Sequence, residues 1–132
     1  MPSSSEIERA AELAREGLRT LAYATRVIDD PQQVYPILGS LSSAVAALSQ
    51  SLHQIAAAHD RRGHTWGADP HRSPAEAPLE VAWELHRAAD ILRQVGEAID
   101  HAHNVEGNIV YRESLVPGAE ASRSSMHTEL HL

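Results

Sequence analysis

Histidine is the residue type with the greatest capacity for chemistry in this sequence, which contains nine histidines and no cysteine among 132 residues. The densest group is Glu97-Ala-Ile-Asp100-His101-Ala-His103. Imidazole nitrogens and carboxylate oxygens are ligands that zinc accepts. On a helix, however, Glu97 and His101 would share one face while Asp100 and His103 would share another. We therefore interpret these histidines as decorating a helix C-terminus, where a partly cationic ring suits the helix dipole.

The remaining histidines offer weaker patterns. His86 and Asp90, four residues apart, would lie on one helix face, and His59, His64 and His71 fall in or beside a predicted loop. The sequence lacks the Glu-x-x-His repeat of di-metal bundles and the His-Glu-x-x-His of zinc proteases. We expect no metal and no cofactor. A His-rich metal-binding helical bundle is the alternative function.

Signatures of catalysis and of nucleic-acid binding are missing as well. There is no Gly-x-Ser-x-Gly, no cysteine nucleophile and no lysine to complete a phosphate-binding Walker motif. The net charge of −7 opposes binding to phosphate backbones. These features predict a protein that is not an enzyme and has no nucleic-acid partner. A small transcriptional regulator is a second alternative that the charge disfavours.

Composition and terminal sequence bear on the compartment. Every basic side chain apart from histidine is arginine, and alanine is abundant, which is typical of a GC-rich bacterial genome. The first residues lack the basic and apolar regions of a signal peptide. No apolar run approaches the roughly 20 residues that span a bilayer. We expect a cytoplasmic protein with no membrane partner.

Three long helices are predicted to position these residues. The first, about 5–28, begins at a capping box formed by Ser5 and Glu8 and ends at Asp29-Asp30-Pro31. The second, about 36–60, starts near Pro36 after a short turn, and carries an apolar stripe opposite a face rich in serine and glutamine. That weakly charged face favours contact with another chain.

A loop over residues 60–74, rich in glycine and proline, separates the second helix from the third. The third helix, about 74–103, is expected to begin with Ser73 as its cap and Pro74 in its first turn, and Asn104 to Gly107 give its stop signal. The sequence thus predicts an all-α fold, an antiparallel bundle of three long helices over residues 1–104. Residues 105–132 are predicted to form an extended or disordered C-terminal tail.

These features favour a non-enzymatic helical interaction protein, an adaptor or accessory subunit. A lone bundle whose core is alanine and medium-sized aliphatics has little stability left after its chain entropy is counted. We therefore expect a homodimer or another homo-oligomer, or a complex with a protein partner. The residues predicted to bind the partner lie on the uncharged face of the second helix, in the loop and in the tail: Ser42, Ser49, Trp66, Tyr111 and Leu115.

Overall fold

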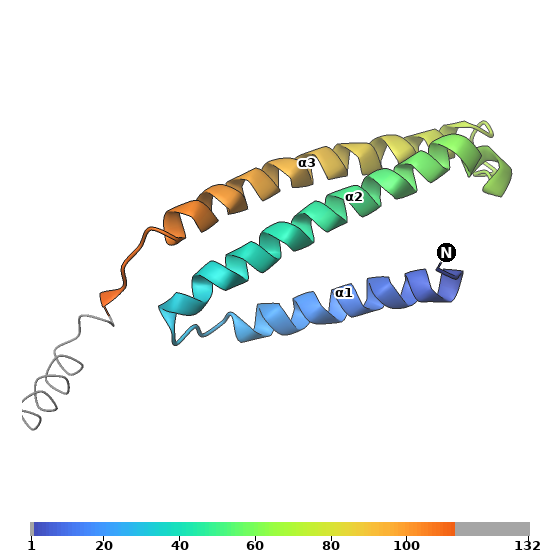
Figure 1. The fold of residues 1–132 in the computed structure, drawn as a ribbon. Coiled ribbons are helices and arrows are strands. Elements are labelled where there is room, and N and C mark those ends of the chain that lie inside the picture. The colour runs from blue at the N-terminus through green and yellow to red at the C-terminus, as the bar shows by residue number, and fades with distance from the viewer. Residues whose placement is uncertain (1, 113–132) are drawn as a thin grey trace, which may run out of the picture. The chain divides into compact units, whose positions relative to one another are not determined.

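The computed structural model describes residues 2–112, and all of its regular structure is helical. Three α-helices follow one another along the chain, with a short 3-10 helix, Pro31–Gln33, before the second of them (Figure 1). The chain divides into two compact units, residues up to Gln33 and residues from Val34 onward, and each is described by itself. The prediction of three long helices is confirmed. The predicted tail beyond residue 112, including Leu115, lies outside the described residues.

Helix α1 spans Ser4–Ala24 and forms the first unit. Its capping box uses Ser3 and Glu6, because the Ser3 hydroxyl accepts from the Glu6 N–H at 3.3 Å and the Glu6 carboxylate accepts from the Ser3 N–H at 2.8 Å. The prediction of Ser5 and Glu8 for these roles was wrong by two residues. The helix ends before Asp29, since the Thr25 hydroxyl and N–H both donate back to the Leu21 carbonyl. No residue of α1 is buried.

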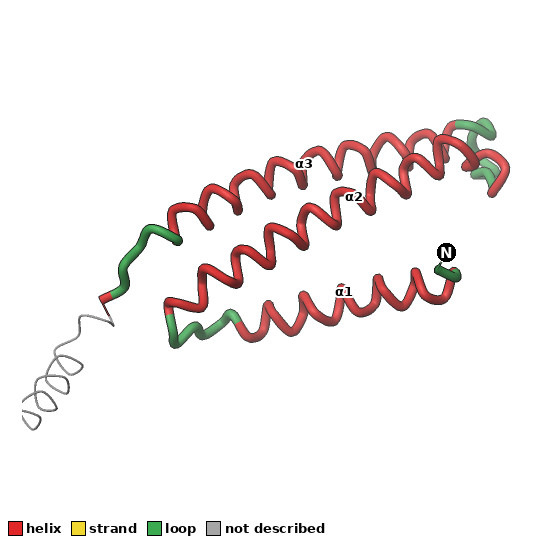
Figure 2. The backbone as a smooth tube through the Cα atoms, viewed as in Figure 1, coloured by secondary structure: helices red, strands yellow, loops and turns green. Residues whose placement is uncertain are grey.

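Helices α2, Val34–Trp66, and α3, Glu76–Glu106, pack against each other and run in opposite directions as a hairpin (Figure 2). Pro36 lies in the first turn of α2, where its missing N–H costs no helical hydrogen bond. The predicted loop at 60–74 was wrong at both ends, because α2 continues to Trp66 and α3 begins at Glu76. The connection between them is therefore residues 67–75.

The centre of the hairpin is built from small side chains. Among the described residues, the buried hydrophobic side chains are Ala56, Ala82 and Ala89. Small residues recur at seven-residue steps on both helices: Ser42, Ser49, Ala56 and Gly63 on α2, and Ala82, Ala89 and Gly96 on α3. A seven-residue step returns to nearly the same helix face, so these residues form one continuous seam. Their size lets the two backbones approach closely.

The N-terminus of α3 also differs from its predicted form. Ala75 is its cap residue, without a side-chain hydrogen bond, and Pro74 precedes the helix. Half of a capping box remains, since the Ser73 N–H donates to the Glu76 carboxylate at 3.1 Å. Arg72 pairs with Glu80 one turn further along, which ties the connection to α3. At the other end, α3 continues three residues beyond His103 and is capped by Gly107.

Candidate functional site

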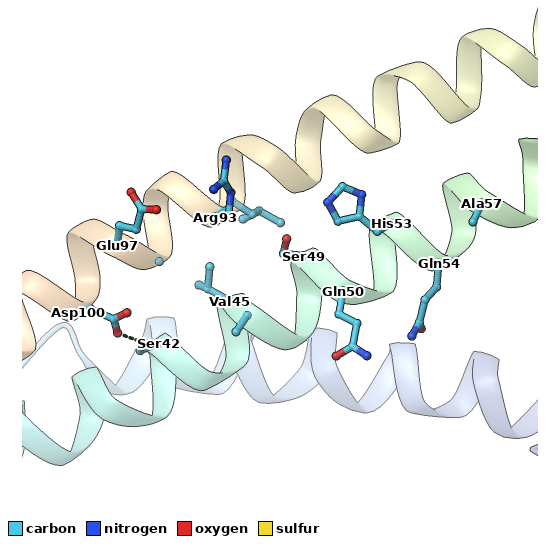
Figure 3. Close-up of a pocket in the computed structure, with 13 residues that line it drawn as sticks. Ser42, Val45, Ser49, Gln50, His53, Gln54, Ala57, Arg93, Glu97 and Asp100 are labelled. Carbon is cyan, nitrogen blue, oxygen red and sulfur yellow. Dashed lines mark hydrogen bonds between the residues drawn. The ribbon is translucent and has the colours of Figure 1, made fainter.

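A groove of about 600 Å³ runs between α2 and α3 on one side of the hairpin (Figure 3). Its floor is formed by small and aliphatic residues, including Gly96 of the seam and Val45 next to it. Its rim is polar, with Gln50 and Gln54 on α2 and Arg93, Glu97 and Asp100 on α3. This side of the hairpin thus combines a mostly apolar groove with a polar rim, and we call it the groove side.

Two of the predicted partner-binding residues lie in this groove and contact α3. Ser42 donates a hydrogen bond to the Asp100 carboxylate (Figure 3), and Ser49 donates to the Ala89 carbonyl at 2.9 Å. Both serines therefore contribute to the packing of the hairpin. The sequence prediction had placed them on the outer face of the second helix, opposite its apolar stripe. Their place on the seven-residue seam is the signal that would have corrected this.

Trp66 lies at the C-terminal end of α2, beside a hollow of about 280 Å³ whose lining includes Gly63, Pro78 and Val81. The indole is 58% exposed and meets the His59 ring edge-on, with 5.4 Å between the ring centroids. Trp66 is thus accessible to a partner. Tyr111, the fourth predicted residue, is partly buried close to the end of the described chain.

A cluster of histidine and aspartate side chains links α2 to α3, and the sequence did not predict it. His53 on α2 and His86 on α3 face each other, with 2.9 Å between their Nδ1 atoms. The His86 Nε2 lies 3.0 Å from the Asp60 carboxylate, and the His53 Nε2 lies 3.5 Å from the Asp90 carboxylate. The seven-residue spacing of His53 and Asp60, four residues after Ser49 on the seam, could have indicated this cluster.

His103, near the end of α3, has a packing role. The His103 ring stacks on Tyr35, with 4.0 Å between centroids and 14° between planes, and closes the end of the hairpin next to Gly39. In residues 2–112, no three or more histidine, aspartate or glutamate side chains are arranged to hold a metal ion.

Arg72 is the charged side chain with the clearest electrostatic perturbation. The hydrogen bond to Glu80, followed by the charge of the same carboxylate, raises the pKa of Arg72, and burial opposes this rise. Glu76 adds to the effect, with its carboxylate 3.9 Å from the Arg72 Nε. These contacts hold the connection 67–75 against the first turns of α3.

The opposite side of the hairpin is aliphatic. On α2, seven-residue steps separate Leu41, Leu48 and Ile55. On α3, two such steps separate Val81 from Val95. None of these residues lines the groove. We call these five residues the aliphatic face. Leu48 and Ile55 are 44% and 47% exposed, and Val81 and Val95 are 40% and 41% exposed.

Comparisons of this chain with protein-family models, with curated proteins and with solved structures find no match. Within residues 2–112, none of the helices combines the length and the apolar character that crossing a membrane requires.

Proposed function

We propose that this chain is a non-enzymatic helical interaction protein, an adaptor or accessory subunit, which self-associates through the aliphatic face of its α2–α3 hairpin. The observation that supports this most is the contrast between the two environments of apolar side chains. The seam buries alanines, whereas the larger aliphatic side chains Leu48, Ile55 and Val95 remain substantially exposed. A two-helix hairpin with so small a core gains little free energy from burial.

A second copy of the chain is the occupant that this face fits. Interfaces in homodimers use the same patch on both subunits, so a face must complement itself. The five residues of the aliphatic face are uncharged. Glu84, which follows Val81 by three residues on α3, is paired with Arg87, so the face meets its own copy without burying an unpaired charge. Two hairpins joined in this way form a four-helix arrangement with aliphatic side chains between the pairs.

Self-association leaves the groove side accessible, and this side and the exposed Trp66 are the surfaces on which an adaptor would meet a further protein. Aromatic side chains such as tryptophan are favoured anchors at interfaces. This assignment rests on the exposure of Trp66 and on its position at the end of the hairpin.

The test is the mass in solution, measured by light scattering over a hundred-fold range of concentration. We expect a dimer for the unaltered chain and a monomer for Leu48→Glu, because a charge at the centre of the interface would be desolvated without a partner. Gln54→Glu, which places the same charge on the groove side, is the matched control and should stay dimeric. Circular dichroism checks that both variants keep their helices. A monomeric unaltered chain at every concentration would contradict the proposal.

A further inference from the structure

Helix α1 carries an apolar stripe with the spacing that pairs helices side by side. Its members follow one another in alternating steps of four and three residues: Ile7, Ala11, Ala14, Leu18 and Leu21. Ile7 and Leu18 are at least half exposed, and no residue of α1 is buried. Since a stripe with this spacing is covered by another helix in helix pairs, the partner that it fits is helical.

Opposite charges lie along one edge of this stripe. Glu8 and Arg15 each follow a residue of the stripe directly, and because they are seven residues apart they lie on the same side of α1. In the described part of the chain neither of them forms an ion pair, whereas Arg9 and Glu12 on the outer side of α1 are 3.5 Å apart. Glu8 and Arg15 are separated by about 10 Å along the helix axis and do not reach each other. Both charges are thus available to a partner.

A second copy of α1 in antiparallel orientation complements these charges. In an antiparallel pair, the same edge of both helices meets, so Glu8 of one copy lies next to Arg15 of the other, and the twofold symmetry repeats the contact. In a parallel pair, this edge would meet the opposite edge of the stripe, where Ala10 and Gly17 carry no charge. Charge complementarity therefore selects the antiparallel orientation.

The same alignment also matches the apolar side chains by size. Leu18 of each copy meets Ile7 of the other towards the ends of the pair, and Ala11 meets Ala14 at its centre. The alanines let the two helices approach closely, and the larger side chains cover them at both ends. No charged residue belongs to the stripe, so the pair forms without burying a charge.

We propose that the two α1 helices of a dimer pair with each other in antiparallel orientation, aligned by Glu8 and Arg15. This inference rests on the proposed function, because a helix as short as α1 pairs weakly by itself and requires the hairpins to bring a second copy close. The antiparallel pair has a twofold axis, as the dimer of hairpins has, so one axis can serve both interfaces. Exposed ion pairs add little affinity, and these two act by fixing the orientation.

Distances between spin labels on the full chain test the orientation. Because the chain has no cysteine, one label per chain can be attached at Ser5→Cys or at Thr20→Cys, which lie on α1 outside the stripe. Every measured distance then joins two copies. In either variant alone, the labels should be offset by fifteen residues, about 22 Å along the helix axis. Mixing the two variants should add a shorter distance that neither gives alone. A mixture that adds a longer distance indicates a parallel pair and would overturn the proposal.

Substitutions in α1 test which side chains form the pair. Leu18→Glu should abolish the label distances, because it places a charge in the stripe, whereas Leu13→Glu, outside the stripe, should retain them. The two leucines are matched in exposure, at 50% and 51%. Circular dichroism checks that both variants keep their helices. Equal effects of the two substitutions would contradict the assigned stripe.

A charge exchange tests the alignment. Glu8→Arg should reduce the paired fraction severalfold, because like charges would then meet at Arg15 of the other copy. Glu8→Arg combined with Arg15→Glu should restore it. If the double variant remains as weakly paired as Glu8→Arg, the assigned contact between these two residues is wrong.

Light scattering on the same labelled chains separates this inference from the proposed function. A dimer whose label distances are broad and insensitive to Leu18→Glu would overturn the pairing of α1 and leave self-association through the aliphatic face intact. A chain that is monomeric at every concentration would contradict both.

Discussion

Gly63 and Pro78 are in contact where α2 and α3 meet near the hairpin tip, with no room for a side chain on the glycine. A Cβ atom built on Gly63 would overlap the Pro78 ring. Glycine inside a helix is destabilising relative to alanine, so its presence here is explained by the close approach of the proline. The contact also explains why α2 continues through a glycine that the sequence pattern assigned to a loop.

Gly63→Ala should therefore destabilise the hairpin despite its better helix propensity. Overpacking costs about 1–3 kcal/mol and the propensity gain returns about 1 kcal/mol, so we expect a net loss of up to about 2 kcal/mol. Urea unfolding followed by circular dichroism measures it. The matched control is Gly96→Ala on α3, where the new Cβ would meet Val45 at an ordinary 3.6 Å, and this variant should be more stable than the unaltered chain. Equal effects of the two substitutions would contradict the close contact at Gly63.

Ser49→Ala tests whether the seam serines hold the helices together. The substitution removes the hydrogen bond from Ser49 to the Ala89 carbonyl, which is partly buried. Ser51→Ala, at an exposed position of the same helix, gives the same gain in propensity without this loss. We expect Ser49→Ala to be less stable than Ser51→Ala by about 1 kcal/mol in the same unfolding measurement. If the two variants are equally stable, the serine does not stabilise the hairpin.

The Arg72 contacts predict a local effect on the connection between the helices. Arg72→Gln should speed amide hydrogen exchange in residues 72–76 severalfold, because the connection loses its ties to Glu76 and Glu80. Arg87→Gln, which removes a pair within α3, is the control and should leave that exchange unchanged. At about 1 M salt, where charges are screened beyond roughly 3 Å, the difference from the unaltered chain should shrink.

The contact between Arg72 and Glu80 also predicts how its stabilising effect depends on pH. Glu80 raises the pKa of Arg72 above its usual value, first through a hydrogen bond and then through its charge. A raised pKa in the folded state means that the stabilisation is complete below the ordinary pKa of arginine and is lost only as the pH rises through the folded value. The difference in amide hydrogen exchange between Arg72→Gln and the unaltered chain should therefore not decline as the pH is raised from 7 to 10. A decline in that interval would argue against this assignment.

The helices were predictable from the sequence because their signals are local. Apolar spacing located all three, and Gly107 marked the end of the last within a few residues. The boundary of α2 was not predictable in this way, since the glycine at position 63 is explained by its close contact with Pro78, fifteen residues later. The placement of Ser42 and Ser49 on the outer face of α2 was wrong for a related reason. The predicted apolar stripe of the second helix consists of large side chains, whereas α2 and α3 meet along their small ones.

The contacts of the histidines in the candidate site were also not predictable from the sequence. His86 was paired with Asp90 because they are four residues apart on one helix. In the folded hairpin each of them instead contacts the other helix, His86 meeting Asp60 and Asp90 meeting His53. Such pairings depend on the register between helices, which no spacing within one helix can specify.

The seven-residue repetition of the seam bears on how that register is maintained. If α3 slid along α2 by one heptad, small residues would again lie opposite small residues, and the backbones could approach equally well. Close packing along the alanine and serine positions therefore permits more than one alignment of the helices, although the Gly63–Pro78 contact fits only one of them. The contacts of His86 with His53 and Asp60, and of Ser42 with Asp100, exist in only one of them. Polar side chains next to the seam thus select a single alignment, as a lone polar residue does in the core of a coiled coil.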